Sequence, residues 1–157
     1  KMRKIIVLSI TFLGIFLNVL GQDLEWEDIS CGNVDLGAVL VDGAKPQVIY
    51  IGSNRGVFKS IDGGKSFRNI LSIRGQNRNV NFLLCDPRDK NSLYAATGNG
   101  LYRSPDQGKH WDRIFKGKNS AEADCRAVAV LPYAIFLGTK QGLFTSGILV
   151  RKRACLI

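Results

Sequence analysis

Residues 60–67 read SIDGGKSF, and residues 104–111 read SPDQGKHW. Both octapeptides follow the pattern Ser-x-Asp-x-Gly-Lys-x-aromatic, and the second lies 44 residues after the first. The match continues without a gap on both sides, from PQVIYIGSNRGVFKSIDGGKSFRNI at 46–70 to KNSLYAATGNGLYRSPDQGKHWDRI at 90–114. Identities this frequent in one register indicate an internal repeat, and a period of about 40–45 residues is a strong guide to fold.

The tetrapeptide GGKS at 63–66 also resembles the end of a phosphate-binding loop. Such a loop needs Gly-x-x-x-x-Gly-Lys-Ser/Thr and leads from a strand into a helix. Five residues before Gly64 stands Lys59, and the FRNIL that follows at 67–71 is strand-like. The second copy has His110 in place of Ser66, so the hydroxyl that would meet magnesium is not kept. The repeat therefore argues against a nucleotide site.

A third, partial copy, YAIFLGTKQGLFTSG, occupies residues 133–147, and the pattern is lost after Ser146. Near the other end, WEDI at 26–29 resembles FRNI at 67–70 and WDRI at 111–114. The sequence thus predicts three units, with the last one incomplete: residues near 26–66, 67–110 and 111–150.

Short apolar runs between turn residues predict four strands in the second unit. These strands are expected at Val80–Cys85, Ser92–Ala96, Gly100–Arg103 and Trp111–Phe115. Outside residues 1–22, no stretch shows helical periodicity over ten or more residues. Four short strands in each repeat are typical of a β-propeller blade. We therefore expect an all-β fold of about three four-stranded antiparallel blades in an incomplete ring.

The pattern Ser-x-Asp-x-Gly-x-x-aromatic resembles the Asp-box, or bacterial neuraminidase repeat, of β-propellers. Proteins with this repeat include photosystem II stability/assembly factors, sortilin-type receptor ectodomains, sialidases and some glycoside hydrolases. In these proteins the box lies on a hairpin between the outer strands of a blade, away from the central ligand face. The resemblance therefore implies a structural role for Ser60, Asp62, Gly64, Phe67, Ser104, Asp106, Gly108 and Trp111.

Elementary chemistry agrees with a structural role for the box. A serine and an aspartate two residues apart can accept hydrogen bonds from the backbone N–H groups of a tight turn. Glycine at positions 64 and 108 permits a positive φ. The aromatic residue that follows opens the next strand and can bury a large area. We assign no catalytic or metal-ligating role to these residues and expect no cofactor.

Residues 1–22 differ in composition from the rest of the chain. Three basic residues precede the uncharged run Ile5 to Leu20, and polarity returns at Gln22. This order is typical of a cleaved secretory signal, while sixteen residues are short for the alternative, a membrane-spanning anchor. We expect a signal at 1–22 and propeller blades at 23–157, in a protein that is secreted, periplasmic or at the cell surface. The membrane is then involved only through export.

The net charge of +9 does not indicate a nucleic-acid partner. Most basic residues are scattered singly beside predicted strands, whereas nucleic-acid binding favours basic clusters interleaved with aromatic residues. The cysteines Cys31, Cys85, Cys125 and Cys155 form no Cys-x-x-Cys pair, so a zinc site has little support. One or two disulfides remain open, and Cys85 is equally compatible with a buried free thiol.

Two groups of acidic residues are candidates for a functional site, one for calcium binding and one for glycoside hydrolysis. Residues 86–91, DPRDKN, lack the spacing, central glycine and final glutamate of a calcium loop, which favours a turn. Glu122 and Asp124 are the best remaining pair for glycoside hydrolysis, but nothing in the sequence places them in a cleft.

Taken together, the sequence predicts an exported, non-catalytic scaffold for protein binding or complex assembly, with a protein or glycan ligand that is not identified. Since three blades do not close a ring, we also expect the chain to be the N-terminal part of a longer propeller. The alternatives are a secreted glycoside hydrolase or sialidase-like enzyme with catalytic residues mostly in other blades, and a sorting-receptor ectodomain.

Overall fold

The computed structural model describes residues 27, 29 and 34–147. The predicted signal at 1–22 therefore lies outside the described residues. Within these residues, eleven strands form three antiparallel sheets, and one short helix lies in the connection between the second and third sheets. The first sheet contains β1 (Leu36–Val41), β2 (Ile49–Ser53), β3 (Gly56–Ser60) and β4 (Arg68–Leu71). The second contains β5 (Val80–Cys85), β6 (Leu93–Thr97), β7 (Gly100–Ser104) and β8 (Asp112–Phe115). The third contains β9 (Cys125–Val130), β10 (Ala134–Thr139) and β11 (Gly142–Gly147).

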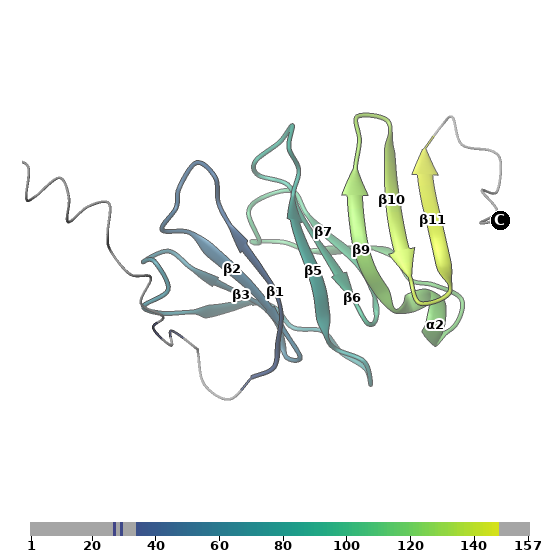
Figure 1. The fold of residues 1–157 in the computed structure, drawn as a ribbon, viewed down its shortest axis with the longest axis horizontal. Helices are drawn as coiled ribbons and strands as arrows, with labels where there is room; N and C mark the ends of the chain where they lie inside the picture. The colour runs from purple at the N-terminus through teal and green to yellow at the C-terminus, as the bar shows by residue number, and fades with distance from the viewer. Residues whose placement is uncertain (1–26, 28, 30–33, 148–157) are drawn as a thin grey trace, which may run out of the picture.

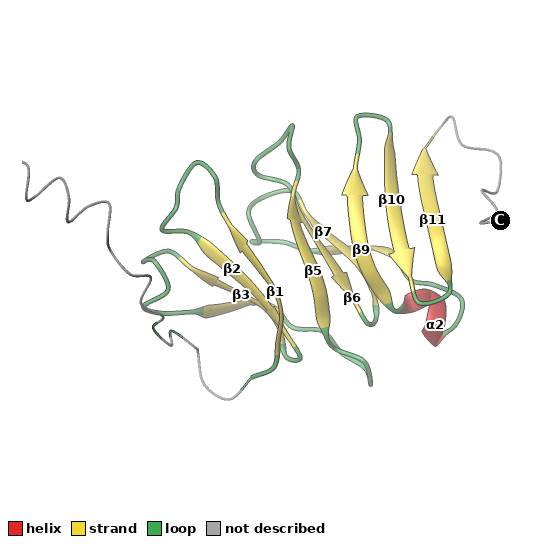
Figure 2. Cartoon of the chain, in the orientation of Figure 1, coloured by secondary structure: helices red, strands yellow, loops and turns green. Residues whose placement is uncertain are grey.

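Each sheet is a simple meander in which strands adjacent in sequence are hydrogen-bonded neighbours. The sheets stand face to face in sequence order, and their first strands, β1, β5 and β9, lie next to one another (Figures 1 and 2). The predicted all-β fold of stacked antiparallel units is confirmed. The third sheet has three strands among the described residues, instead of the four seen in the first two.

The strands lie close to their predicted positions, but the sheets begin at different residues from the predicted repeat units. Each of the first two sheets ends with the strand that opens the next repeat unit, because β4 and β8 follow Phe67 and Trp111. Repeat boundaries at 67 and 111 therefore fall between the third and fourth strands of a sheet.

One element was not predicted, the four-residue helix α2 (Ser120–Ala123). Its N-cap Asn119 accepts hydrogen bonds from the backbone N–H groups of Ala121 and Glu122, which explains how so short a helix is stabilised. None of the helices in the described part of the chain has the length and apolar character needed to cross a membrane.

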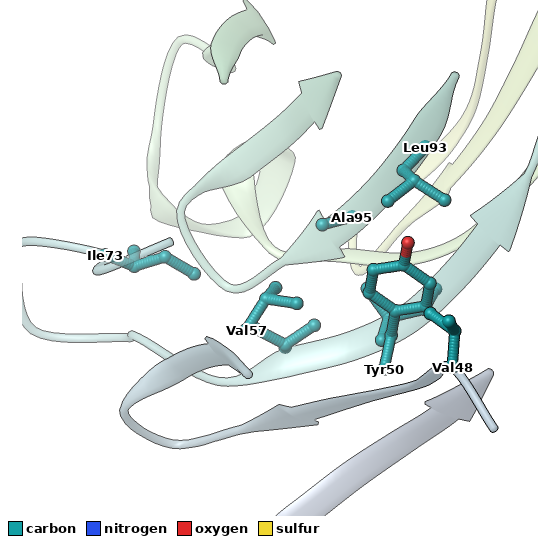
Figure 3. Close-up of a cluster of buried hydrophobic side chains, with 8 residues drawn as sticks. Val48, Tyr50, Val57, Ile73, Leu93 and Ala95 are labelled. Atoms are coloured by element: carbon teal, nitrogen blue, oxygen red, sulfur yellow. The ribbon is translucent and has the colours of Figure 1, made fainter. Parts of the chain in front are cut away.

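Two separate apolar clusters hold the three sheets together. The first lies between the first and second sheets and includes Tyr50, Val57 and Leu93 (Figure 3). The second lies between the second and third sheets and includes Tyr94, Leu101 and Leu137. Because strand side chains alternate between faces, the neighbours Leu93 and Tyr94 on β6 enter different clusters. The second sheet is thus buried on both faces.

The ends of the strands form two distinct edges. At one edge, the backbone N–H groups of Asn54, Gly98 and Lys140, all in turns after second strands, donate to carbonyls just before first strands. We call this the hairpin edge, formed by residues 34–35, 54–55, 72–79, 98–99, 116–124 and 140–141. At the opposite edge, Gly63 and Gln107 donate to Gln47 and Asn91. We call this the box edge, formed by residues 42–48, 61–67, 86–92, 105–111 and 131–133.

Candidate functional site

The first octapeptide forms a closed network around the buried hydroxyl of Ser60. Ser60 Oγ donates to Asp62 Oδ1 at 2.7 Å and accepts from the backbone N–H of Gly64 at 2.9 Å. Asp62 in turn accepts from the backbone N–H of Ser66 at 3.0 Å and from its hydroxyl at 2.6 Å. Gly64 has φ +93°, which a residue with a side chain rarely adopts. The hydroxyl of Ser60 and the carboxylate of Asp62 are therefore both used within the turn.

The second octapeptide repeats this network with one substitution. Ser104 Oγ donates to Asp106 Oδ1 at 2.9 Å and accepts from the backbone N–H of Gly108 at 2.8 Å. The backbone N–H of His110 donates to Asp106 Oδ1 at 2.8 Å, and its ring Nδ1 contacts Asp106 Oδ2. His110 thus contacts the box aspartate as Ser66 does, although the sequence comparison showed only that it replaces the serine.

These contacts lower the pKa of both box aspartates, because each hydrogen bond favours the charged carboxylate. The hydroxyl of Ser66, followed by that of Ser60, lowers the pKa of Asp62 from 3.8 to about 2. The backbone N–H and the ring of His110 lower the pKa of Asp106 well below its usual value. Both carboxylates are therefore hydrogen-bond acceptors at neutral pH and not proton donors.

The aromatic residues of the two boxes lie in different surroundings. Trp111 packs against the cluster between the first and second sheets. Phe67 lines a groove of about 600 Å³ on the face of the first sheet that points away from the second. This groove is also lined by Val39, Ile51 and Ile29. The aromatic residue of the second box therefore packs against a neighbouring sheet, whereas that of the first box borders a groove.

Lys59 connects the first sheet to the second box. Its Nζ lies 5.2 Å from the centroid of the Tyr50 ring and donates to the carbonyl of Gln107 at 3.1 Å. In the second sheet, Arg103 lies 5.9 Å from the centroid of the Tyr94 ring. The octapeptides and the residues before them thus link turns, strands and neighbouring sheets.

The two edges differ in charge. The box edge contains five lysine or arginine residues and five acidic residues. The hairpin edge contains six basic and three acidic residues. Its basic residues are Arg55, Arg74, Arg78, Lys116, Lys118 and Lys140. All six are exposed. The hairpin edge is therefore the positively charged one.

Glu122 and Asp124, the candidate pair for glycoside hydrolysis, are both engaged in structural contacts. Asp124 is buried, and its Oδ2 accepts from Arg126 Nη2 at 2.6 Å. Its Oδ1 accepts from Asn81 Nδ2 at 3.3 Å, an interaction that joins the second sheet to the third. Glu122 Oε2 accepts from the backbone N–H of Lys118 at 2.7 Å. Both carboxylates organise the connection between β8 and β9.

The DPRDKN segment at 86–91 has the geometry of a turn. Asp86 is buried and forms an ion pair with Arg88 at 2.9 Å, which lowers the pKa of Asp86. Asp89 accepts from the backbone N–H of Asn91 and the hydroxyl of Ser92. Within the described ranges, no three His, Cys, Asp or Glu residues are grouped so that they could hold a metal ion.

A second, smaller groove of about 160 Å³ lies between the second and third sheets. Its lining includes Ile114 and Phe115 of β8, with Ile135 of β10 and Phe144 of β11. The Phe115 and Phe144 rings are 5.2 Å apart between centroids. This groove lies beside the last strand of the three-stranded sheet.

Solved structures resemble most of this chain. An ancestral GH74 enzyme matches 71% of this chain with a TM-score of 0.61 and 17% identity. YCF48 from Cyanidioschyzon merolae matches 78% with a TM-score of 0.60 and 19% identity. The extracellular domain of BT4673 from B. thetaiotaomicron matches 79% with a TM-score of 0.57 and 19% identity. The chain is an open arc of β-propeller blades. The predicted resemblance to propellers of the assembly-factor and glycoside-hydrolase kinds is confirmed at the level of fold.

Sequence comparison gives a shorter match. A protein of Neosartorya fischeri named "Probable oligoxyloglucan-reducing end-specific xyloglucanase" is 31% identical over 80 residues, or 47% of this chain. No protein-family model matches the sequence. The chain spans about a tenth of that relative, 17% of the ancestral GH74 chain and 37% of the YCF48 chain. These blades therefore correspond to a part of each larger propeller.

Proposed function

We propose that the chain is an exported, non-catalytic β-propeller scaffold that binds protein or assembles a complex through its hairpin edge. Stacked sheets make a rigid support, and the loops at one edge of such a stack are well placed to carry a binding surface. Export is proposed from the order of basic, apolar and polar residues at 1–22.

The observation that carries the non-catalytic assignment is the use of the carboxylates. Glycoside hydrolysis needs one carboxylic acid with a raised pKa facing a second carboxylate across the sugar. In the described blades, Asp62, Asp86, Asp89 and Asp106 each accept hydrogen bonds within a turn, and the pKa of each is lowered. Such carboxylates suit turn stabilisation and not proton donation.

The charge of the hairpin edge indicates the chemistry of the partner. The exposed residues Arg74 and Arg78 lie in the connection between the first and second sheets, and Arg55 and Lys140 lie in β-turns of the first and third. Basic side chains supplied by all three sheets favour an acidic protein surface over an apolar one. The neutral box edge has no such preference.

Site-specific photo-cross-linking tests the scaffold function. A photoreactive residue replaces Arg78 on the hairpin edge, and a matched variant carries it at the exposed Lys65 on the box edge. We expect a protein adduct from position 78 and none from position 65, in cells that export the chain. Equal labelling from both positions contradicts the proposal. Turnover of any chromogenic glycoside or xyloglucan oligosaccharide by the purified chain contradicts its non-catalytic part.

We also propose that the eight box residues stabilise the fold and do not contact the partner. The support is that the buried hydroxyls of Ser60 and Ser104 bond their own turns. The loss of stability expected for Ser104→Ala tests the stabilising role.

A glycoside hydrolase is the second candidate function, with catalytic residues mostly in blades other than these three. It is favoured by the 31% identity to the xyloglucanase relative and by the fold of the GH74 enzymes. Hydrolysis of the same glycoside panel by the full-length protein, with all of its blades, separates the two functions, because turnover there would support the hydrolase.

A further inference from the structure

Four basic residues gather at the box edge where the first sheet meets the second. Lys59 and Arg68 stand opposite each other on β3 and β4. Lys59 Nζ donates to the carbonyl of Gln107 at 3.1 Å, two residues before Lys109 in the second box. Burial lowers the pKa of Lys59, and the nearby charges of Arg68, Lys109 and Lys45 lower it further. We call these residues the junction cluster: Lys45, Lys59, Arg68 and Lys109.

The second sheet has the same pairing of strands, but with balanced charges. Arg103 occupies the position of Lys59 in the repeat, and it stands opposite Asp112 on β8. Arg103 Nη2 also donates to Ser92 Oγ at 3.1 Å, and that hydroxyl donates to Asp89 Oδ2 at 2.7 Å. The cation of the second sheet therefore has a hydroxyl and two carboxylates as neighbours.

Each of these partners is replaced in the first sheet, 44 residues earlier in the sequence. Arg68 replaces the carboxylate on the paired strand, Val48 replaces the hydroxyl, and Lys45 replaces the second carboxylate. Opposite charges on two paired strands stabilise a sheet, whereas like charges directly opposite each other destabilise it. Because the second sheet forms with balanced charges, the fold does not require the junction cluster.

The carboxylates near the junction cluster are engaged in their own turns. Asp42 raises the pKa of Lys59, and its Oδ1 accepts from two backbone N–H groups of the turn that it opens. Asp106, three residues before Lys109, contacts the ring and the backbone N–H of His110. These acceptors leave the cluster with an excess of positive charge among the described residues.

We propose that the junction cluster is a binding site for a small tetrahedral oxyanion, the phosphate or sulfate group of an ester. The anion supplies the negative charge that Asp89 and Asp112 supply in the second sheet. Lys59 is held in place for this role, because its Nζ lies 5.2 Å from the centroid of the Tyr50 ring and donates to the carbonyl of Gln107. An ammonium group has three N–H donors, so two remain that can donate to the anion.

The chemistry of the cluster favours a compact group with several acceptor oxygens. A guanidinium binds phosphate-like groups through two parallel N–H bonds, and lysines bind them as point charges. One arginine and three lysines come to this site from the β1–β2 loop, β3, β4 and the second box. The site lies at the opposite edge from the hairpin edge, so the inference does not depend on the proposed scaffold function.

Titration of the full chain, followed by nuclear magnetic resonance, tests the site. The probes are glucose 6-phosphate and glucose 6-sulfate, which share one sugar, and glucose is the uncharged control. We expect at least one ester to bind and glucose not to bind, and the ester that binds more tightly identifies the source of the oxyanion. Failure of both esters to bind overturns the proposal.

Arg68→Asp gives the first sheet the charge pattern of the second, because a carboxylate then stands opposite Lys59 as Asp112 stands opposite Arg103. This variant should weaken ester binding by about ten- to a hundredfold, since one charged hydrogen-bonding partner is lost. Its unfolding midpoint without ester should rise, because a like-charge pair is removed. Arg55→Asp is the matched control, since it makes the same change of charge at an exposed arginine of the hairpin edge. It should leave ester affinity unchanged, and an equal loss of affinity in both variants overturns the proposal.

Lys45→Asp provides a second variant that does not require Arg68→Asp to fold. It copies Asp89 of the second sheet at an exposed position, and it should also weaken ester binding. The wild-type resonances that shift on titration should include those of Lys59 and Lys109. Unchanged affinity in Lys45→Asp, or shifts confined to the hairpin edge, overturns the assignment of the site to the junction cluster.

Discussion

Replacing Ser104 with alanine tests whether the box hydroxyl holds the blade together. Ser104 is fully buried, and its hydroxyl donates to Asp106 and accepts from the backbone N–H of Gly108 at 2.8 Å. The substitution leaves that buried N–H without its partner, whereas Asp106 keeps its contacts with His110. A buried donor left unsatisfied costs about 1–3 kcal/mol. We therefore expect Ser104→Ala to lower the free energy of unfolding by about 2 kcal/mol.

Urea unfolding followed by circular dichroism measures this change, with an unchanged slope and a lower midpoint as the expected result. Ser146→Ala is the matched control, because Ser146 occupies the same repeat position in the third sheet but is exposed. Its effect should stay within about 0.5 kcal/mol. If Ser104→Ala destabilises the protein no more than Ser146→Ala does, the structural role assigned to the box hydroxyl is wrong.

Three further predictions follow from the same geometry. The pKa of Asp62 is lowered to about 2, and that of Asp106 is also lowered, so the two carboxylates stabilise the fold fully above about pH 4 and lose this effect as the pH falls towards 2. Unfolding midpoints measured between pH 5 and 2 should therefore fall less steeply when both residues are replaced by asparagine. Burial raises the pKa of Tyr50 to about 12, so the neutral phenol stabilises the folded state below pH 10, and this stabilisation is lost as the pH rises towards 12. Tyr50→Phe should remove the component of the ultraviolet titration near pH 12, and a component that persists in this variant contradicts its assignment to Tyr50. Gly100→Ala should lower the thermal unfolding midpoint strongly, because Gly100 has φ +115° and an added Cβ would meet the carbonyl of Phe115, the last residue of β8. Gly43→Ala is the control and should have little effect, because a Cβ at that position meets no other atom. Similar midpoints for the two variants would contradict this reasoning.

Most of the fold could be predicted because the repeat supplies the same information twice. The strand Val80–Cys85 was predicted with its observed bounds, and the strand predicted from Ser92 begins one residue later, at Leu93. Helix α2 was missed because four residues are too few for a helical period, although Asn119 followed by Glu122 is a recognisable capping pattern.

The charged edge could not be predicted from the sequence for a geometric reason. Arg55, Arg78 and Lys140 are far apart in the chain and were described as scattered. In a meander, successive turns alternate between the two edges, so residues brought to one edge are separated along the chain by residues of the other. The role of His110 was missed for a related reason, because Ser66 and His110 differ chemically and only the turn geometry shows that both contact an aspartate.

The separation of the apolar core into two clusters has a consequence for synthesis of the chain. All buried residues of the first cluster are present once Ala95 has been made, whereas those of the second require Leu137. Domains and repeats fold progressively as the polypeptide emerges during translation. A ribosome-bound intermediate of two sheets would therefore already have a finished core, and each later sheet would be added to a surface that is ready to receive it.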